Sequence, residues 1–85
     1  MAAAEALPAD TLYDLACVYA LCAAAARADE NQAGAYADRA VELLRRAVAT
    51  GFNDARRLKK DPNLGAIRAR DGFQKLLGEL EKKQD

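Results

Sequence analysis

The sequence has no histidine and no tryptophan, and its 85 residues include only two cysteines and two prolines. Without histidine, the chain lacks the commonest general base, the commonest ligand of transition metals and the usual pH switch. Cys17 and Cys22 are five residues apart, which sets them about 140° apart around a helix and too far from each other for a disulfide. We therefore expect no metal, no cofactor and no catalytic activity, with both thiols as small buried groups in a reducing cytoplasm.

Basic residues are scarce in the first half of the chain and acids are the minority in the second, although 13 basic and 13 acidic residues balance overall. Residues 1–44 hold two bases and seven acids, and residues 45–85 hold eleven bases and six acids. The basic half predicts one alternative function, the binding of nucleic acid or of a phosphorylated partner. Nucleic acid is disfavoured because the basic pairs fall near predicted helix C-termini, where the helix dipole favours positive charge. The residues of this candidate basic face are Arg45, Arg46, Arg56, Arg57, Lys59 and Lys60.

The stretch from Leu15 to Ala26 contains no charged residue. A helix that is hydrophobic nearly all round has to be covered on more than one side. The stretch is too short to span a membrane, which takes about 20 residues, and it is preceded by acids rather than by the bases of a signal peptide. We therefore expect a cytoplasmic protein with no membrane partner, in which the rest of the chain or another protein covers this helix.

Hydrophobic spacing predicts a single all-α domain over residues 1–85, with residues 1–7 frayed and no strand. Two long helices, at about 9–27 and 32–50, form an antiparallel hairpin, and a short helix at 54–60, a helical turn at 63–68 and a last helix at 72–83 close it. Gly51 is expected to end the second helix in the left-handed conformation, so that Phe52 folds back onto Ala47. Phe73 begins the apolar core stripe of the last helix.

The first helix has two apolar stripes at helical spacing. One stripe consists of Leu12, Leu15, Tyr19, Cys22 and Ala26. The second helix is expected to cover Leu15, Ala16 and Tyr19. The second stripe is either buried by the C-terminal helices or open as a contact surface for a neighbouring repeat, a second copy of the chain or a peptide. The residues of this stripe, the candidate partner-binding face, are Tyr13, Cys17, Ala20 and Leu21.

Several residues of the two long helices have the spacing of a known repeat. They are Leu12, Leu15, Ala16 and Tyr19 in the first helix, and Ala40, Leu44 and Ala47 in the second. The pair of helices resembles one tetratricopeptide repeat, whose pattern is W-x2-L-G-x2-Y, then A-x3-F, then P. The sequence departs from the pattern at Leu12, which replaces tryptophan, at Ala16, which replaces glycine, and at Phe52, which stands where proline is frequent. The interval from Tyr19 to Ala40 is also about a dozen residues longer than usual.

The resemblance implies that the two helices approach most closely at Ala16 and Ala40. It also implies that Tyr13, Asp14, Cys17 and Leu21 match the ligand-facing positions of the repeat. Many peptide-binding members of the family carry asparagine where this chain has Asp14, so a clamp for a peptide carboxylate is not expected.

Three segments together extend the resemblance over most of the chain. LYDLACVYALCAAAA, YADRAVELLRRAVATGFNDARRLKKDPNL and IRARDGFQKLL are similar to the C-terminal segment of certain bacterial serine/threonine protein kinases that carry repeats after the kinase domain. The sequence has no glycine-rich loop, no HRD and no DFG, so kinase chemistry is not expected. The resemblance implies a protein-interaction or repeat-capping module, from a signalling kinase or from a stand-alone relative.

Overall fold

The computed structural model describes residues 7–83, with side chains described for residues 7–82. Within this range the elements are α1 (Ala9–Ala25), α2 (Glu30–Thr50), α3 (Ala55–Lys60), the 3₁₀ helix η2 (Pro62–Ile67) and α4 (Asp71–Lys83). The predicted all-α fold is confirmed, and each predicted element ends within two residues of an observed one. Fraying was predicted for residues 1–7. Residues 1–6 lie outside the described range, which begins at Leu7.

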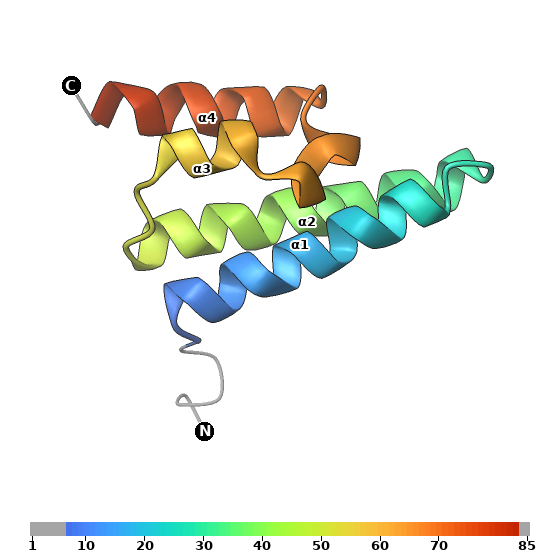
Figure 1. Cartoon of the computed structure of the whole chain (residues 1–85), viewed down its shortest axis with the longest axis horizontal. Helices are drawn as coiled ribbons and strands as arrows, with labels where there is room; N and C mark the ends of the chain where they lie inside the picture. The colour runs from blue at the N-terminus through green and yellow to red at the C-terminus, as the bar shows by residue number, and fades with distance from the viewer. Residues whose placement is uncertain (1–6, 84–85) are drawn as a thin grey trace.

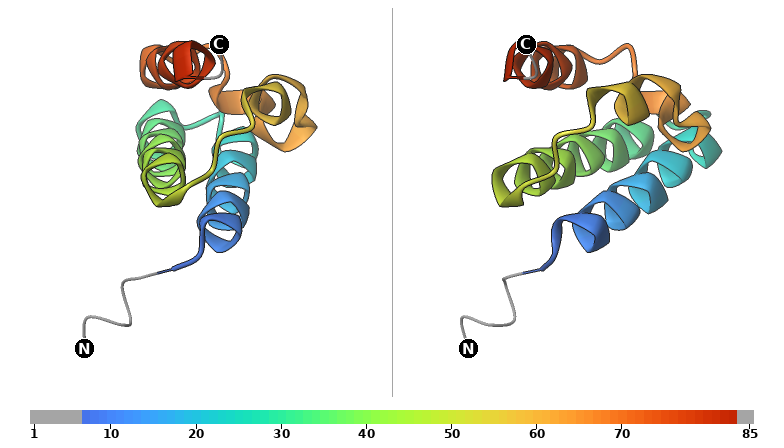
Figure 2. Two further views of the ribbon diagram at one scale, coloured as in Figure 1. Left: turned by 90° about the vertical axis from the view of Figure 1, so that its left-hand side faces the viewer. Right: turned by 60° about the vertical axis from the view of Figure 1, so that its left-hand side comes forward.

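The two long helices α1 and α2 run antiparallel, side by side, and the three shorter elements lie together on one side of this hairpin (Figure 1). Helix α4 runs along α2, η2 packs against α1, and α3 contacts α4 (Figure 2). Helix α1 therefore packs against α2 on one side and against η2 on another. Its remaining side faces away from every other element (Figure 2).

Short polar residues and one glycine set the helix ends. The carboxylate of Asp29 accepts a hydrogen bond from the Gln32 backbone N–H at 3.2 Å and begins α2. The carboxylate of Asp54 does the same for α3, from Arg57 N–H at 3.0 Å. Each carboxylate satisfies a backbone donor that the helix itself leaves free.

Gly51 ends α2 with a φ of +134°, as predicted. Its N–H donates to the carbonyl oxygens of Ala47 and Val48, both at 3.1 Å, and the next N–H, of Phe52, donates to Ala47 at 2.9 Å. This pattern satisfies the last carbonyls of the helix and turns the chain back toward it. Phe52 is consequently buried in the core.

The core consists of alanines between the long helices and larger side chains beneath α3, η2 and α4. Ala16, Ala40 and Ala47 are fully buried, which agrees with a close approach of α1 and α2. Leu44 and Phe73 are fully buried too. Tyr19 is half-buried and packs against Tyr36 of α2, with ring centroids 6.3 Å apart. The larger core residues from the second half of the chain are Leu58, Leu64, Ile67, Phe73, Leu76, Leu77 and Leu80.

The structure corrects the predicted orientation of α1. Tyr13, Cys17 and Ala20 are buried, whereas Leu15, which was expected to face α2, is 37% exposed. The reason is that η2 lies beside α2, so the covered arc of α1 is centred between these two neighbours. Of the two alternatives for the second stripe, burial within the domain is therefore correct for Tyr13, Cys17 and Ala20, but not for Leu21.

Candidate functional site

A polar contact joins α1 to the turn between α3 and η2. Asp61 precedes Pro62 and is extended, with φ −66° and ψ 115°, as the following proline requires. One of its carboxylate oxygens, Oδ1, accepts the backbone N–H of Asn63 at 2.9 Å and begins η2. The other, Oδ2, accepts the hydroxyl of Tyr13 at 2.7 Å and the thiol of Cys17 at 3.9 Å. One carboxylate thus orders η2 and attaches it to α1.

Two further side chains contact the ring of Tyr13. Phe52 stacks against it, with centroids 4.9 Å apart and an interplanar angle of 29°. The guanidinium carbon of Arg57 lies 4.2 Å from the centroid of the same ring, which is cation–π distance. Tyr13 therefore connects α1 with the end of α2, with α3 and with Asp61.

Arg68 stabilises the same turn from inside. Its Nη2 donates to the backbone carbonyls of Leu58 at 3.1 Å and Asp61 at 2.6 Å. The carbonyl of Arg68 accepts the Gln74 side-chain amide at 2.7 Å, which links the turn to α4. Arg68, which belongs to the basic half of the chain, is therefore engaged with the backbone of its own domain.

The protonation states of this cluster do not favour catalysis. Burial, followed by the nearby charge of Asp61, raises the pKa of Cys17 to about 11. Burial and the hydrogen bond to Asp61 raise the pKa of Tyr13. Burial acts to raise the pKa of Asp61, but the hydrogen bonds from Tyr13 and Asn63 outweigh it and lower that pKa. At neutral pH the thiol keeps its proton and is a weak nucleophile, so the cluster acts as a structural link.

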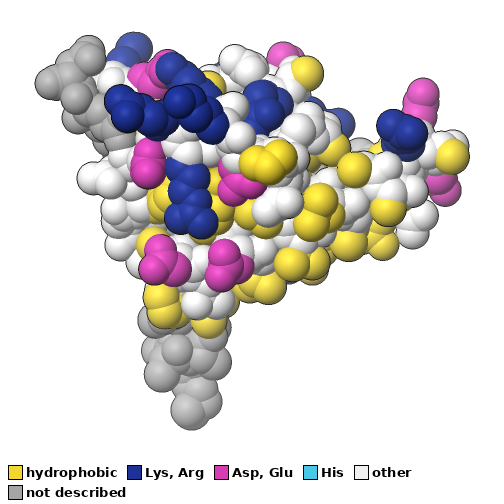
Figure 3. All heavy atoms as spheres, in the orientation of Figure 1, with side chains coloured by type: hydrophobic (Ala, Val, Ile, Leu, Met, Phe, Trp, Pro, Cys, Tyr) yellow, Lys and Arg dark blue, Asp and Glu magenta, His cyan; other side chains and the backbone are white. Residues whose placement is uncertain are grey.

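The open side of α1 carries a row of large apolar side chains. Leu15, Val18 and Leu21 follow one another at intervals of three residues and are 37%, 53% and 50% exposed. Hydrophobic side chains lie along α1 in Figure 3, with acidic side chains beside its first turns. We call Leu15, Val18 and Leu21 the α1 ridge.

The predicted partner-binding face is divided by the structure. Asp14 and Leu21 lie on the open side of α1, whereas Tyr13, Cys17 and Ala20 are buried within the domain. Val18 was missed by the sequence analysis. Its interval of three from both Leu15 and Leu21, inside the uncharged stretch, is the signal that could have identified it.

The candidate basic face is used in part for internal contacts. Arg57 lies over Tyr13, Arg46 pairs with Glu42 at 3.8 Å, and Lys59 pairs with Glu81. Lysine and arginine side chains gather over α3 and the adjoining part of α4 in Figure 3. No aromatic side chain of the described part is exposed among them, so the face lacks the stacking surface typical of single-stranded nucleic-acid sites.

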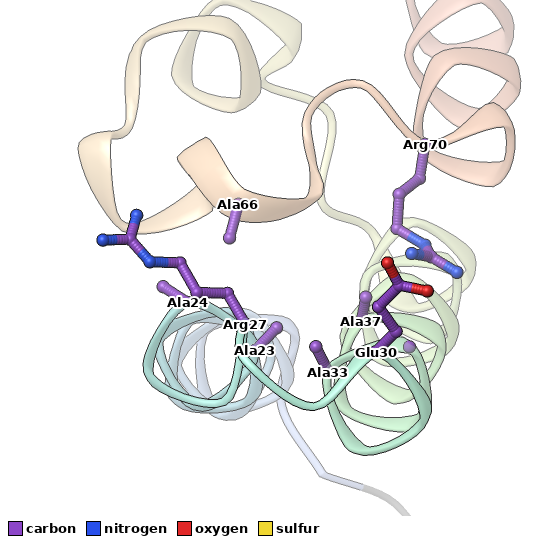
Figure 4. Close-up of a pocket in the computed structure, with 9 residues that line it drawn as sticks. Ala23, Ala24, Arg27, Glu30, Ala33, Ala37, Ala66 and Arg70 are labelled. Atoms are coloured by element: carbon purple, nitrogen blue, oxygen red, sulfur yellow. The ribbon is translucent and has the colours of Figure 1, made fainter.

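A shallow groove lies near the turn between α1 and α2. Its floor is made almost entirely of alanine and glycine, and Arg27 lies on one side while Glu30 and Arg70 lie on the other (Figure 4). Arg70 is already paired with Asp38 at 3.1 Å. The residues that line the groove are Ala23, Ala24, Arg27, Glu30, Ala33, Gly34, Ala37, Ala66 and Arg70.

Other kinds of site find no support in the described residues. Within residues 7–82, no group of three or more histidine, cysteine, aspartate or glutamate side chains could hold a metal ion. No helix in the described range combines the length and the apolar character that a membrane span requires. Comparison of the chain with protein-family models, curated proteins and solved structures finds no match. The resemblance to tetratricopeptide repeats and to the kinase segment therefore stays a prediction.

Proposed function

We propose that this chain is a non-catalytic protein–protein interaction module, and that the α1 ridge is the surface that a protein partner or a neighbouring helical repeat covers. The observation that carries the proposal is the exposure of Leu15, Val18 and Leu21 in one row. Single exposed hydrophobic residues are ordinary on protein surfaces, but a row on one helix is typical of a contact site. Covering the three half-exposed side chains would contribute on the order of 1 kcal/mol each.

The rest of the structure gives the ridge no internal role. Among the described side chains, Leu15, Val18 and Leu21 are the large hydrophobic residues that remain exposed. Tyr13, on the side of α1 next to the ridge, is buried, because η2 packs against that side. The C-terminal elements thus complete the core without reaching the ridge.

The chemistry of the described side chains supports a binding role over catalysis. The chain has no histidine, and the one thiol beside a carboxylate, Cys17, has a pKa raised to about 11. The resemblance to tetratricopeptide repeats and to the kinase C-terminal segment supports a place in or beside a repeat array, in a cytoplasmic signalling kinase or a stand-alone relative. In such an array the ridge would face the preceding helices.

Photo-crosslinking from the ridge tests the proposal. A benzophenone amino acid placed at Val18 should give discrete protein adducts in cells that express the full chain. The same amino acid at Glu79, an exposed position on α4, serves as the control and should not give these adducts. Leu21→Glu, introduced beside the position-18 probe, should remove the adducts and leave the circular-dichroism spectrum unchanged. Equal labelling from Val18 and Glu79, or adducts that survive Leu21→Glu, would contradict a contact site on α1.

A further inference from the structure

The open side of α1 carries charge of only one sign. Asp10 and Asp14 are the charged residues between Ala9 and Ala25, and both are exposed. Among the described side chains neither is in an ion pair. They precede Val18 by eight and four residues. They therefore lie on the same side of the helix, about two turns and one turn before the centre of the ridge.

The charged residues on α2 and α3 are arranged differently from those on the open side of α1. On α2, Glu42 lies between Arg39 and Arg46 and pairs with both, at 3.6 and 3.8 Å. On α3, Lys59 is paired with Glu81 of α4. Several charged residues of α2, α3 and α4 therefore have counter-charges within the domain, whereas neither Asp10 nor Asp14 has an ion-pair partner among the described side chains.

Resting on the proposed function, we infer that the partner of the α1 ridge is an amphipathic helix whose apolar stripe is flanked by lysine or arginine. Its apolar stripe would cover Leu15, Val18 and Leu21, and its basic residues would lie over the N-terminal half of α1, beside Asp10 and Asp14. An apolar stripe at helical spacing is recognised by a matching stripe on a second helix. The charges beside it set the choice of partner and the association rate more than the affinity.

A second copy of α1 fits this surface less well. It would bring a further Asp10 and Asp14 and no base of its own to the contact, because α1 contains no lysine or arginine. Two such helices would leave four acids without a counter-charge at the edges of an apolar contact. Unpaired charges beside a desolvated surface disfavour association.

Two designed peptides test the inference on the full 85-residue chain. Both are amphipathic helices of about 18 residues, long enough to pass the ridge and both acids. They share one leucine stripe, and the flanking residues are lysine in one peptide and glutamate in the other. Fluorescence anisotropy in low salt should show saturable binding of the lysine peptide, at least about tenfold tighter than that of the glutamate peptide. Added salt should reduce this preference because it screens exposed charges.

Charge reversal in the protein supplies the matched control. Asp14→Lys should weaken the lysine peptide and strengthen the glutamate peptide. Glu79→Lys makes the same change of net charge at an exposed position on α4 and should leave the affinities of both peptides unchanged. Val18→Glu and Leu21→Glu should each lower the affinity for the lysine peptide at least about tenfold, since each places a charge in an apolar contact, without lowering helicity.

Several results would overturn the inference. They are equal affinities for the two peptides, no saturable binding of the lysine peptide, equal effects of Asp14→Lys and Glu79→Lys, and binding that survives both ridge variants. A concentration-dependent dimer that Leu21→Glu abolishes would assign the surface to a second copy instead. If the photo-crosslinks from Val18 are present and the peptides show no charge preference, the proposed function stands and only the basic partner is excluded.

Discussion

Tyr13 and Asp61 are 48 residues apart in the sequence and are joined by a 2.7 Å hydrogen bond from the phenol to the carboxylate. The contact closes η2 onto α1, and it places Asp61 where its other oxygen begins η2. The same contact explains why Tyr13 is buried. The ridge stays open because the attachment lies on the neighbouring side of α1.

Removing the phenol should measure this attachment. Tyr13→Phe keeps the stacking on Phe52 and the contact with Arg57 but leaves the Asp61 carboxylate without its closest donor. A hydrogen bond to a charged acceptor contributes about 1.5–3 kcal/mol to stability, and we expect a loss at the lower end because Asp61 is only partly buried. Urea unfolding measures the change. A double-mutant cycle that combines Tyr13→Phe with Asp61→Asn should give a favourable coupling energy. A coupling energy near zero would show that the hydrogen bond contributes nothing to stability.

The stability of the domain should fall at both ends of the pH range. The pKa of Asp61 is lower in the folded state than the ordinary value of 3.8, so its contribution is present above pH 4 and is lost as the pH falls through the folded pKa. The pKa of Cys17 is raised from 9.0 to about 11, and that of Tyr13 is raised above 10.0. The contribution of Cys17 is complete below pH 9 and is lost as the pH rises to about 11, whereas that of Tyr13 is complete below pH 10 and falls as the pH rises further.

Urea midpoints between pH 2.5 and pH 11 would show this profile. In Tyr13→Phe the loss of stability at low pH should be smaller, because Asp61 then lacks the hydrogen bond from Tyr13 that lowers its pKa in the folded state. The alkaline loss should also be smaller, because phenylalanine does not titrate. A variant whose profile follows the parent at both ends would contradict the assignment of these groups.

Two neighbouring residues of α1 should differ greatly in how much stability they lose on substitution by glutamate. Leu21 is half-exposed, so Leu21→Glu should change the free energy of unfolding by less than about 0.5 kcal/mol. Ala20 is fully buried, so Ala20→Glu would bury an unpaired carboxylate, cost several kcal/mol and unfold a domain of this size. Circular dichroism and thermal melting distinguish the two. Comparable losses from both substitutions would mean that Leu21 is part of the core.

Gly34 inside α2 and Gly51 just past its end provide a second matched pair. Gly51 has a φ of +134°, which an L-residue rarely adopts, so Gly51→Ala should destabilise the domain by about 1 kcal/mol. Gly34 lies within the helix, and a Cβ there would meet nothing within 4 Å. Gly34→Ala should therefore stabilise the domain by about 0.5–1 kcal/mol. Thermal melting of both variants gives the signs, and a stabilised Gly51→Ala would be inconsistent with the end of α2 at this residue.

The sequence by itself determined the elements and their ends. The ends of α2 and α3 depend on residues close by, on the side chains of Asp29 and Asp54 and on the backbone of Gly51, so local chemistry is enough to predict them. The hairpin followed from the alanine-rich stripes of α1 and α2. The all-α class and the order of the five elements were predicted from the spacing of hydrophobic residues along the chain.

Only the tertiary structure decided which side of α1 is open. The apolar residues of α1 are spread around nearly its whole circumference, so their spacing does not distinguish the side that faces α2, the side that faces η2 and the side that faces outward. The choice depends on where η2 packs, and the contact of Asp61 with Tyr13, which connects distant parts of the chain, attaches the start of η2 to α1. Of the residues predicted for the binding face, Asp14 and Leu21 are on the open side, whereas Leu15 and Val18 were recognised only from the packed domain. A helix with apolar residues all round takes its orientation from the neighbours that pack against it, and its own sequence does not specify them.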